Sequence, residues 1–203
     1  MKTNYNELMQ KMISELDKVP KLLLHSCCGP CSTSVIERLT PYFDITIIYY
    51  NPNIEPINEY EKRKNEQIRF INEYQGINKI NYLDIDYLHE DFVKMAKGLE
   101  TEPEGGARCT RCYELRLYKT ALIAQEKGFD YFGTTLTVSP YKHADIINQI
   151  GEKISKELNV KYLYSDFKKQ DGYKESIELA KKYNLYRQNY CGCHFSQTIG
   201  IEE

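Results

Sequence analysis

Short apolar stretches that alternate with longer amphipathic stretches constrain the fold of this chain more than any other feature of the sequence. The stretches typical of strands lie near residues 21–25, 44–50, 79–84, 131–135 and 161–164. The stretches typical of helices lie near residues 4–18, 32–39, 55–74, 87–97, 110–127, 143–158 and 173–183. This alternation predicts an α/β fold with a mostly parallel sheet and helices on both of its faces.

The chain has 203 residues and shows no internal repeat, linker or low-complexity tract. That length suits one hydrophobic core. We therefore expect a single domain over residues 1–203, with an amphipathic helix within residues 1–20 and the main core over 21–196.

Reactive residues directly follow two of the predicted strands. His25-Ser-Cys-Cys comes after the first strand, and the loop from Thr134-Thr135 to Lys142 comes after the fourth. Ligands of parallel sheets bind beyond the carboxyl ends of the strands. We therefore expect these two segments to meet at one edge of the sheet and to form the site there.

Charge and hydropathy indicate where in the cell the protein works. The formal net charge is -2, so a polyanion would have to be held by a local basic patch. No run of about 18 apolar residues indicates a membrane span. The first 20 residues are polar and lack the apolar centre of a signal peptide. We expect a cytoplasmic protein that does not enter the membrane.

Seven cysteines form three groups, which are Cys27-Cys28-x-x-Cys31, Cys109-x-x-Cys112 and Cys191-x-Cys193. Disulfides are uncommon in the cytosol, so this clustering indicates metal binding. Cys109 and Cys112 share one face at a helix start, where backbone N–H groups favour thiolates, and Cys27 and Cys28 have the same advantage. Four thiolates suit a [4Fe–4S] cluster. A four-cysteine zinc site is the alternative, although adjacent cysteines diverge and are awkward ligands for one ion.

Four residues in or beside these groups keep alternative roles. Cys31 is surplus to a four-ligand cluster, so it binds a second, mononuclear metal or packs at the helix start. Cys191-Gly-Cys193 can close into a strained, reducible disulfide, or supply further metal ligands or idle thiols. His25 is the best candidate for a proton donor.

Basic and aromatic residues indicate where a nucleic acid could bind. Basic residues gather at Arg108, Arg111, Arg116 and Lys119, and again at Lys168, Lys169, Lys174, Lys181, Lys182 and Arg187. Tyrosines on which bases could stack accompany the second group at Tyr173, Tyr183, Tyr186 and Tyr190. The alternative is a solvated helix face.

The motifs together resemble the epoxyqueuosine reductases of the QueH type. The resemblance rests on His25-Ser-Cys-Cys-Gly-Pro-Cys31, Cys109-Thr-Arg-Cys112, Tyr190-Cys-Gly-Cys193, Tyr49-Tyr-Asn-Pro-Asn53-Ile and Gly133-Thr-Thr-Leu-Thr137-Val-Ser-Pro140. It implies a HUP-like α/β fold and the last step of queuosine synthesis, in which epoxyqueuosine at the tRNA wobble position is reduced without cobalamin.

The resemblance also implies roles for individual residues. Cys27, Cys28, Cys109 and Cys112 would be the cluster ligands, and Cys191 and Cys193 the redox-active disulfide. A second metal ion, iron, would lie beside the cluster; some members carry Asp where this chain has Cys31. The partner would be tRNA carrying epoxyqueuosine, with an external electron donor that the sequence does not identify. We expect substrate contacts from Thr134, Thr135, Tyr141, Lys142, Arg187 and Tyr190.

Two other functions compete with this interpretation. One is a cluster-dependent nucleobase desulfurase or sulfur transferase. ATP-dependent enzymes of that kind carry a Ser-Gly-Gly-x-Asp-Ser phosphate loop after the first strand, where this chain has Cys-Cys-Gly-Pro-Cys. The other is a non-enzymatic, zinc-stabilised RNA-binding module, which would leave Cys191 and Cys193 unused.

Overall fold

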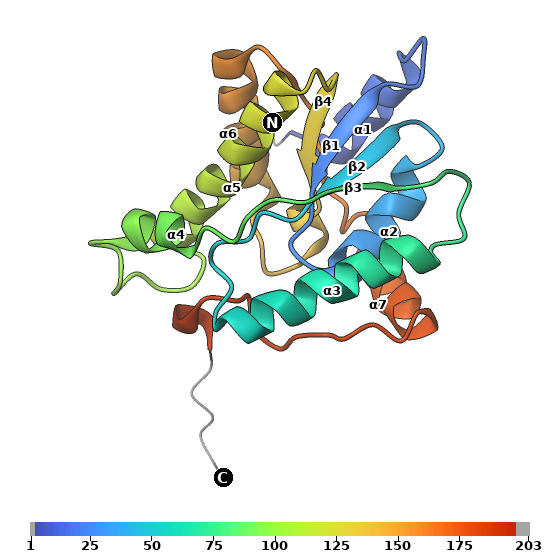
Figure 1. Ribbon diagram of the computed structural model, residues 1–203. Helices are drawn as coiled ribbons and strands as arrows, with labels where there is room; N and C mark the ends of the chain where they lie inside the picture. Colours follow the sequence, from blue (N-terminus) through green and yellow to red (C-terminus); the bar gives the residue numbers. More distant parts are fainter. Residues whose placement is uncertain (1–2, 198–203) are drawn as a thin grey trace.

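The computed structural model describes residues 3–197 as a five-stranded parallel sheet covered by helices (Figure 1). The strands are β1 (Lys21–His25), β2 (Asp44–Ile48), β3 (Asn81–Leu83), β4 (Tyr131–Thr134) and β5 (Lys161–Tyr162). The helices are α1 (Tyr5–Ser14), α2 (Gly29–Leu39), α3 (Ile57–Glu73), α4 (His89–Ala96), α5 (Ala107–Glu126), α6 (Ala144–Leu158) and α7 (Gly172–Lys182), with short 3-10 helices η1 (Leu136–Val138) and η2 (His194–Ser196).

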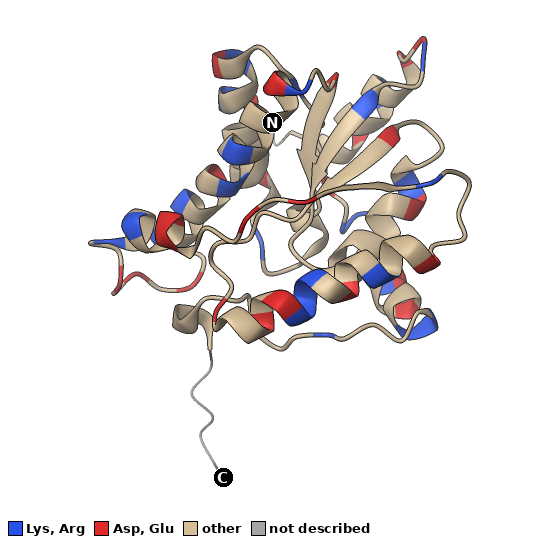
Figure 2. Cartoon of the chain, in the orientation of Figure 1, with Lys and Arg blue, Asp and Glu red and all other residues tan. Residues whose placement is uncertain are grey.

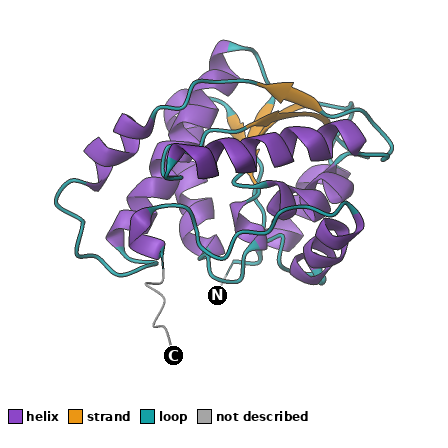
Figure 3. Cartoon of the chain, turned by 60° about the horizontal axis from the view of Figure 1, so that its bottom comes forward, coloured by secondary structure: helices purple, strands orange, loops and turns teal. Residues whose placement is uncertain are grey.

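Alternating side chains of β1 divide the core into two layers. Leu22 and Leu24 point to the face covered by α2, α3 and α7, whereas Leu23 points to the face covered by α5 and α6. All three leucines are 0% exposed. A strand buried on both faces reads as a continuous apolar run, which explains the sequence Leu22-Leu-Leu24. Helices therefore enclose the short sheet on both sides (Figure 3).

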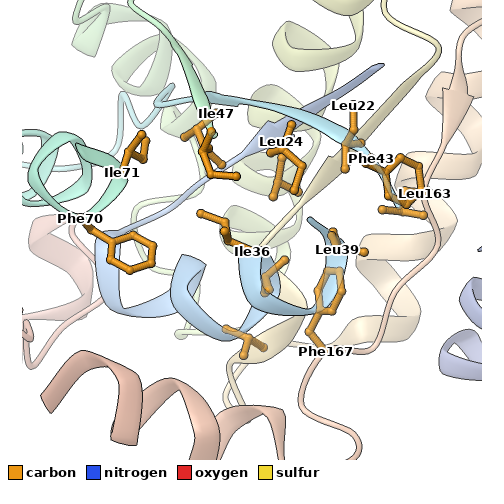
Figure 4. Packing of buried hydrophobic residues seen from close by; sticks show 14 of the residues in the cluster. Leu22, Leu24, Ile36, Leu39, Phe43, Ile47, Phe70, Ile71, Leu163 and Phe167 are labelled. Atoms are coloured by element: carbon orange, nitrogen blue, oxygen red, sulfur yellow. The ribbon is translucent and has the colours of Figure 1, made fainter. Parts of the chain in front are cut away.

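The first layer is closed by side chains from well-separated segments (Figure 4). Ile36 and Leu39 of α2 meet Phe70 and Ile71 of α3 over the strands, and Phe167 closes the far end. Helix α1 adds Met9, which is 2% exposed, to this layer. The layer fixes α2, and with it the turn that precedes α2.

The strand order β3-β2-β1-β4-β5 places a change of direction between β1 and β4. The chain first builds outward from β1 through β2 to β3, and then returns to add β4 on the other side. The loops that leave the carboxyl ends of β1 and β4 therefore diverge, and such a point is where open parallel sheets bind ligands. His25 at the end of β1 is paired in register with Thr134 at the end of β4.

The predicted fold class is confirmed, and the arrangement is consistent with a HUP-like fold. Each predicted strand and helix is present, although β5 spans only two residues and α1 ends at Ser14 instead of near residue 18. Within residues 3–197, no helix has the length and apolar character needed to cross a membrane.

Gly151 of α6 provides a test of the second layer, because a Cβ at this position would run into the ring of Tyr162. Alanine normally stabilises a helix by about 1 kcal/mol relative to glycine. Overpacking costs about 1–3 kcal/mol, and so close an approach to the ring places this case in the upper part of that range. After the gain from alanine, we expect Gly151→Ala to lower the free energy of unfolding by roughly 1–2 kcal/mol in urea titrations. Glu157→Ala, at an exposed position of the same helix, should change it by about 0.5 kcal/mol or less. A Gly151→Ala protein as stable as the wild type would contradict this packing.

Candidate active site

The turn between β1 and α2 brings three cysteines together. The sulfur atoms of Cys27, Cys28 and Cys31 all lie within 4.8 Å of one another. Cys28 is the N-cap residue of α2, and Pro30 in the first turn favours the helix start. The backbone N–H of Cys27 donates to Thr135 Oγ1 at 3.4 Å, which connects this turn to the loop after β4. This cysteine triad could bind a metal ion.

A second group of cysteines lines a narrow cavity beside the triad. Cys109 and Cys112 lie in the first two turns of α5, and Cys191 and Cys193 come from the segment before η2. The backbone N–H of Gly105 donates to Cys109 Sγ at 3.2 Å. Two segments about 80 residues apart in the sequence therefore face the same space.

A larger cavity of about 550 Å³ connects the two groups. Its walls include Cys27 and Cys31 from the triad and Cys191, which also lines the narrow cavity. All seven cysteines, which lie within residues 3–197, are free in the structure. The structure thus places Cys31 with Cys27 and Cys28, a grouping that its spacing alone left open.

The triad has an uneven distribution of charge. Hydrogen bonds from the Cys28 and Cys31 thiols, together with the cation of Lys142, hold the pKa of Cys27 well below its usual range. Donation to Cys27 and burial raise the pKa of Cys28 to about 12. Cys27 is therefore the thiolate of the triad, and thiolates are the form of cysteine that binds metals.

His25 joins the ends of three strands. Its Nε2–H donates to the backbone carbonyl of Tyr50 at 3.1 Å, because that oxygen can only accept. Its Nδ1 must then accept from Thr134 Oγ1 at 3.0 Å. Burial, reinforced by the charge of Arg116, lowers the pKa of His25 to about 4. A neutral, 0% exposed ring with both nitrogens occupied favours a structural role over proton donation.

The expected substrate contacts divide into two sets. Thr134 and Thr135 are at most 1% exposed and line neither cavity, because their hydroxyls bind His25 and the Cys27 turn. The others line the large cavity: Tyr141, Lys142, Arg187 and Tyr190. Tyr141 is 83% exposed at its mouth.

The segment of residues 183–193, which we call the C-terminal segment, runs along α3 from the end of α7 (Figure 1). Arg69 of α3 donates to the carbonyls of Tyr183 and Asn184 at 3.1 and 2.9 Å, and Glu66 accepts the N–H of Tyr186 at 2.7 Å. These contacts carry the segment across the helix toward the cysteines.

Arg63 holds the cysteine end of the C-terminal segment. It is 1% exposed, and its Nη1 donates to the carbonyl of Cys191 at 3.1 Å while Nε pairs with Glu59 at 2.6 Å. Gly192 follows with φ of 138°, and a Cβ there would lie 2.8 Å from Ile54. Arg63 cannot be singled out in the sequence, because only its buried position distinguishes it from the many surface charges of α3.

The basic residues near Cys109 and Cys112 are less available than their sequence suggests. Arg108 and Arg116 are 3% and 1% exposed, so they cannot form an outer surface for nucleic acid. Arg111 is exposed but pairs with Glu114 at 2.8 Å. Along α3, Lys and Arg are interspersed with Glu (Figure 2).

Comparisons with known proteins agree with this geometry. The family model described as "Epoxyqueuosine reductase QueH" matches residues 22–199. A Staphylococcus epidermidis protein with the same name is 48% identical over 202 residues, covering 96% of this chain and 85% of the relative. The chain belongs to the QueH family. An Acinetobacter baylyi member is 40% identical over 89% of this chain and 82% of its own, and one from Thermotoga maritima is 36% identical over 86% and 89%.

As a QueH family member, the chain carries its site entirely inside the matched region. The three cysteine groups lie between residues 27 and 193, and the match starts within β1. The donor set is chemically suited to iron, since soft thiolates select iron–sulfur clusters and zinc over magnesium or calcium. The part of the chain that the structure describes thus contains a cysteine triad that could hold a metal ion, and four further cysteines line the neighbouring narrow cavity.

The buried imidazole of His25 should give the protein an acid-sensitive stability. Its pKa is near 6.5 in the unfolded chain and about 4 in the fold, so protonation between these values favours unfolding. We expect the metal-free protein to lose about 3 kcal/mol of unfolding free energy through this group between about pH 7 and pH 4. Urea unfolding at several pH values should give a flatter curve for His25→Gln in this window. Equal slopes for the two proteins would show that His25 is not held neutral.

Proposed function

We propose that this chain reduces epoxyqueuosine to queuosine in tRNA, as an oxidoreductase of queuosine biosynthesis. The observation that carries the proposal is that the QueH match spans residues 22–199 and that six of the seven cysteines in it line two adjoining cavities, which share Cys191. A cavity of about 550 Å³ lies within the usual range for small-molecule sites, and it suits one modified nucleobase.

We propose a [4Fe–4S] cluster held by Cys27, Cys28, Cys109 and Cys112. Cys31, which lies in the triad, would bind an adjacent mononuclear iron. When bound, such a centre supplies one-electron transfer and a Lewis acid. The burial of Cys28 and Cys112, at 1% and 6% exposure, supports a water-poor site for this chemistry.

The reaction needs two electrons and two protons, because an epoxide becomes an alkene and its oxygen leaves as water. The Cys191 and Cys193 thiols can supply the two electrons and the two protons, because their oxidation to a disulfide releases both. An external reductant must then restore the two thiols. The position of Cys191 on both cavities supports this role, since it adjoins the substrate space and the cluster ligands.

Lys142 is the residue that we propose to contact the epoxide oxygen. Burial alone would lower its pKa, but the sulfurs of Cys191, Cys27 and Cys31 outweigh burial and raise it. The ammonium group therefore keeps its proton and can donate a hydrogen bond. Thr134 and Thr135 would act only indirectly, by holding the loop that leads to Lys142.

The tRNA would approach the mouth of the large cavity. Exposed Tyr141 offers a ring for stacking, and Arg187 offers a charge for phosphate, while Tyr190 donates from its hydroxyl to the carbonyl of Glu55 at 2.9 Å and is fixed in the wall. We expect the protein to work in the cytoplasm, where tRNA is modified.

The reaction can be tested with protein purified without oxygen. Incubation with epoxyqueuosine-containing tRNA and dithionite should produce queuosine, detected by mass spectrometry of the digested tRNA. Cys109→Ala should abolish the product and lower the content of iron and acid-labile sulfide, because it removes a proposed ligand. Tyr118→Phe, at an exposed position of the same helix, should leave both unchanged.

Other outcomes would identify the competing functions. A full cluster with no queuosine would contradict the reductase and favour a nucleobase desulfurase. Zinc without iron or labile sulfide would favour the RNA-binding module.

Arg187 tests the proposed approach of tRNA. Charge reversal by Arg187→Glu should weaken tRNA binding roughly tenfold at low salt and reduce the dependence of the binding constant on salt, because a phosphate contact is lost. Lys127→Glu makes the same charge change at an exposed site beyond the far end of α5 and should have little effect. Filter binding over a salt series gives both quantities. Equal losses in the two variants would indicate a general charge effect instead of a docking site.

A further inference from the structure

Arg116 is a buried cation whose charge the protein does not balance with a carboxylate. The residue lies on α5 and is 1% exposed. Its Nε donates to the carbonyl of Cys112 at 3.2 Å, and Nη1 reaches Asn51 Oδ1 at 3.5 Å. Nη2 is buried and meets no hydrogen-bond acceptor among residues 3–197. Both contacts are to neutral oxygens, so the positive charge is left uncompensated.

Two arginines of α3 pair with carboxylates, whereas buried Arg108, which lines the same narrow cavity, donates from Nη1 to three backbone carbonyls. Buried Arg63 pairs with Glu59 at 2.6 Å, and Arg69 pairs with Glu66 at 3.0 Å and with Glu73 at 2.9 Å. Arg116 has no carboxylate within 4.0 Å in the described part of the chain. Glu104 is the one carboxylate among the described residues lining the same narrow cavity, and its side chain is exposed. An unpaired buried ion costs several kcal/mol, so a negative partner is expected.

Besides the ring of Tyr113, whose centroid lies 5.6 Å from Cζ, the groups that Arg116 faces include several cysteine sulfurs. Cys112 lies one helical turn earlier on the same face of α5, and Cys191 faces the same cavity. Asn51, which Nη1 reaches, donates from its own Nδ2 to the carbonyl of Ser26 at 2.8 Å. Arg116 therefore lines the narrow cavity with the second cysteine group and is linked through Asn51 to the turn that carries the triad. These cysteines become anionic when they bind a metal.

We infer that Arg116 is the internal counter-charge of the metal–thiolate centre. Its positive charge makes the reduction potential of that centre less negative than it would be without the charge. This inference rests on the iron–sulfur centre proposed above. Arg116 is a positioning residue, since it acts on the reaction only through the charge of the centre.

The physical effect follows from the charge change on reduction. One electron passes from a one-electron reductant to the centre, the reductant is oxidised, and the guanidinium keeps its proton. The centre thus becomes more negative by one charge, and a nearby cation stabilises the reduced form more than the oxidised form. Because Arg116 is buried, water and salt screen this attraction weakly. Loss of the charge should therefore shift the potential to a more negative value.

The experiment compares Arg116→Met, which removes the charge at similar size, with Arg116→Lys, which keeps it. Arg111→Met is the matched control, because Arg111 is exposed on the same helix and already paired with Glu114. Iron and labile sulfide are measured first, and an EPR-monitored titration with dithionite then gives the midpoint potential. We expect a negative shift in Arg116→Met, a smaller one in Arg116→Lys, and none in Arg111→Met.

The iron content and the midpoint potential of the Arg116 variants decide whether Arg116 has this role. A fully loaded Arg116→Met protein with the wild-type potential would overturn it. If Arg116→Met cannot retain the centre, retention by Arg116→Lys supports the requirement for charge, and loss in both variants overturns it in favour of a packing role. Wild-type iron content and queuosine formation are read separately. A wild-type protein without iron would therefore refute the proposed centre itself, whereas an unshifted potential would refute only the role of Arg116.

Discussion

The hydrogen bonds of His25 fix the place on which the whole site depends. β1 and β4 are neighbours at the change of direction in the sheet, and the ring of His25 joins their ends to the backbone after β2. The two loops that leave this point carry the cysteine triad and Lys142. Because the ring is buried, neutral and hydrogen-bonded at both nitrogens, it holds the starting points of these two loops in place.

A second constraint brings in the cysteines that are distant in sequence. The C-terminal segment has little regular structure, and side chains of α3 hold it in place along its length. Arg63 of α3 and Glu55, whose N–H donates to the carbonyl of Gly192 at 3.0 Å, hold the end of the segment from which Cys191 and Cys193 line the narrow cavity. Charged residues of α3 thus support the C-terminal segment without lining the large cavity.

Much of this arrangement could be predicted from the sequence. The run Leu22-Leu-Leu24 and the turn Cys27-Cys28-Gly-Pro indicated the central strand and its site, because strand and turn patterns are local. The exposure of side chains could not be predicted in the same way. Arg108 and Arg116 looked like surface charges, and His25 looked like a proton donor, because burial depends on how α5 and the strands pack.

We propose that all three cysteine groups surround one iron-containing centre. A crystal structure of protein kept free of oxygen, with anomalous data collected on both sides of the iron edge and of the zinc edge, tests this directly. We expect iron density enclosed by Cys27, Cys28, Cys109 and Cys112, next to the guanidinium group of Arg116. Density with a zinc signature, or iron bound by the triad alone with Cys109 and Cys112 turned away, would contradict it.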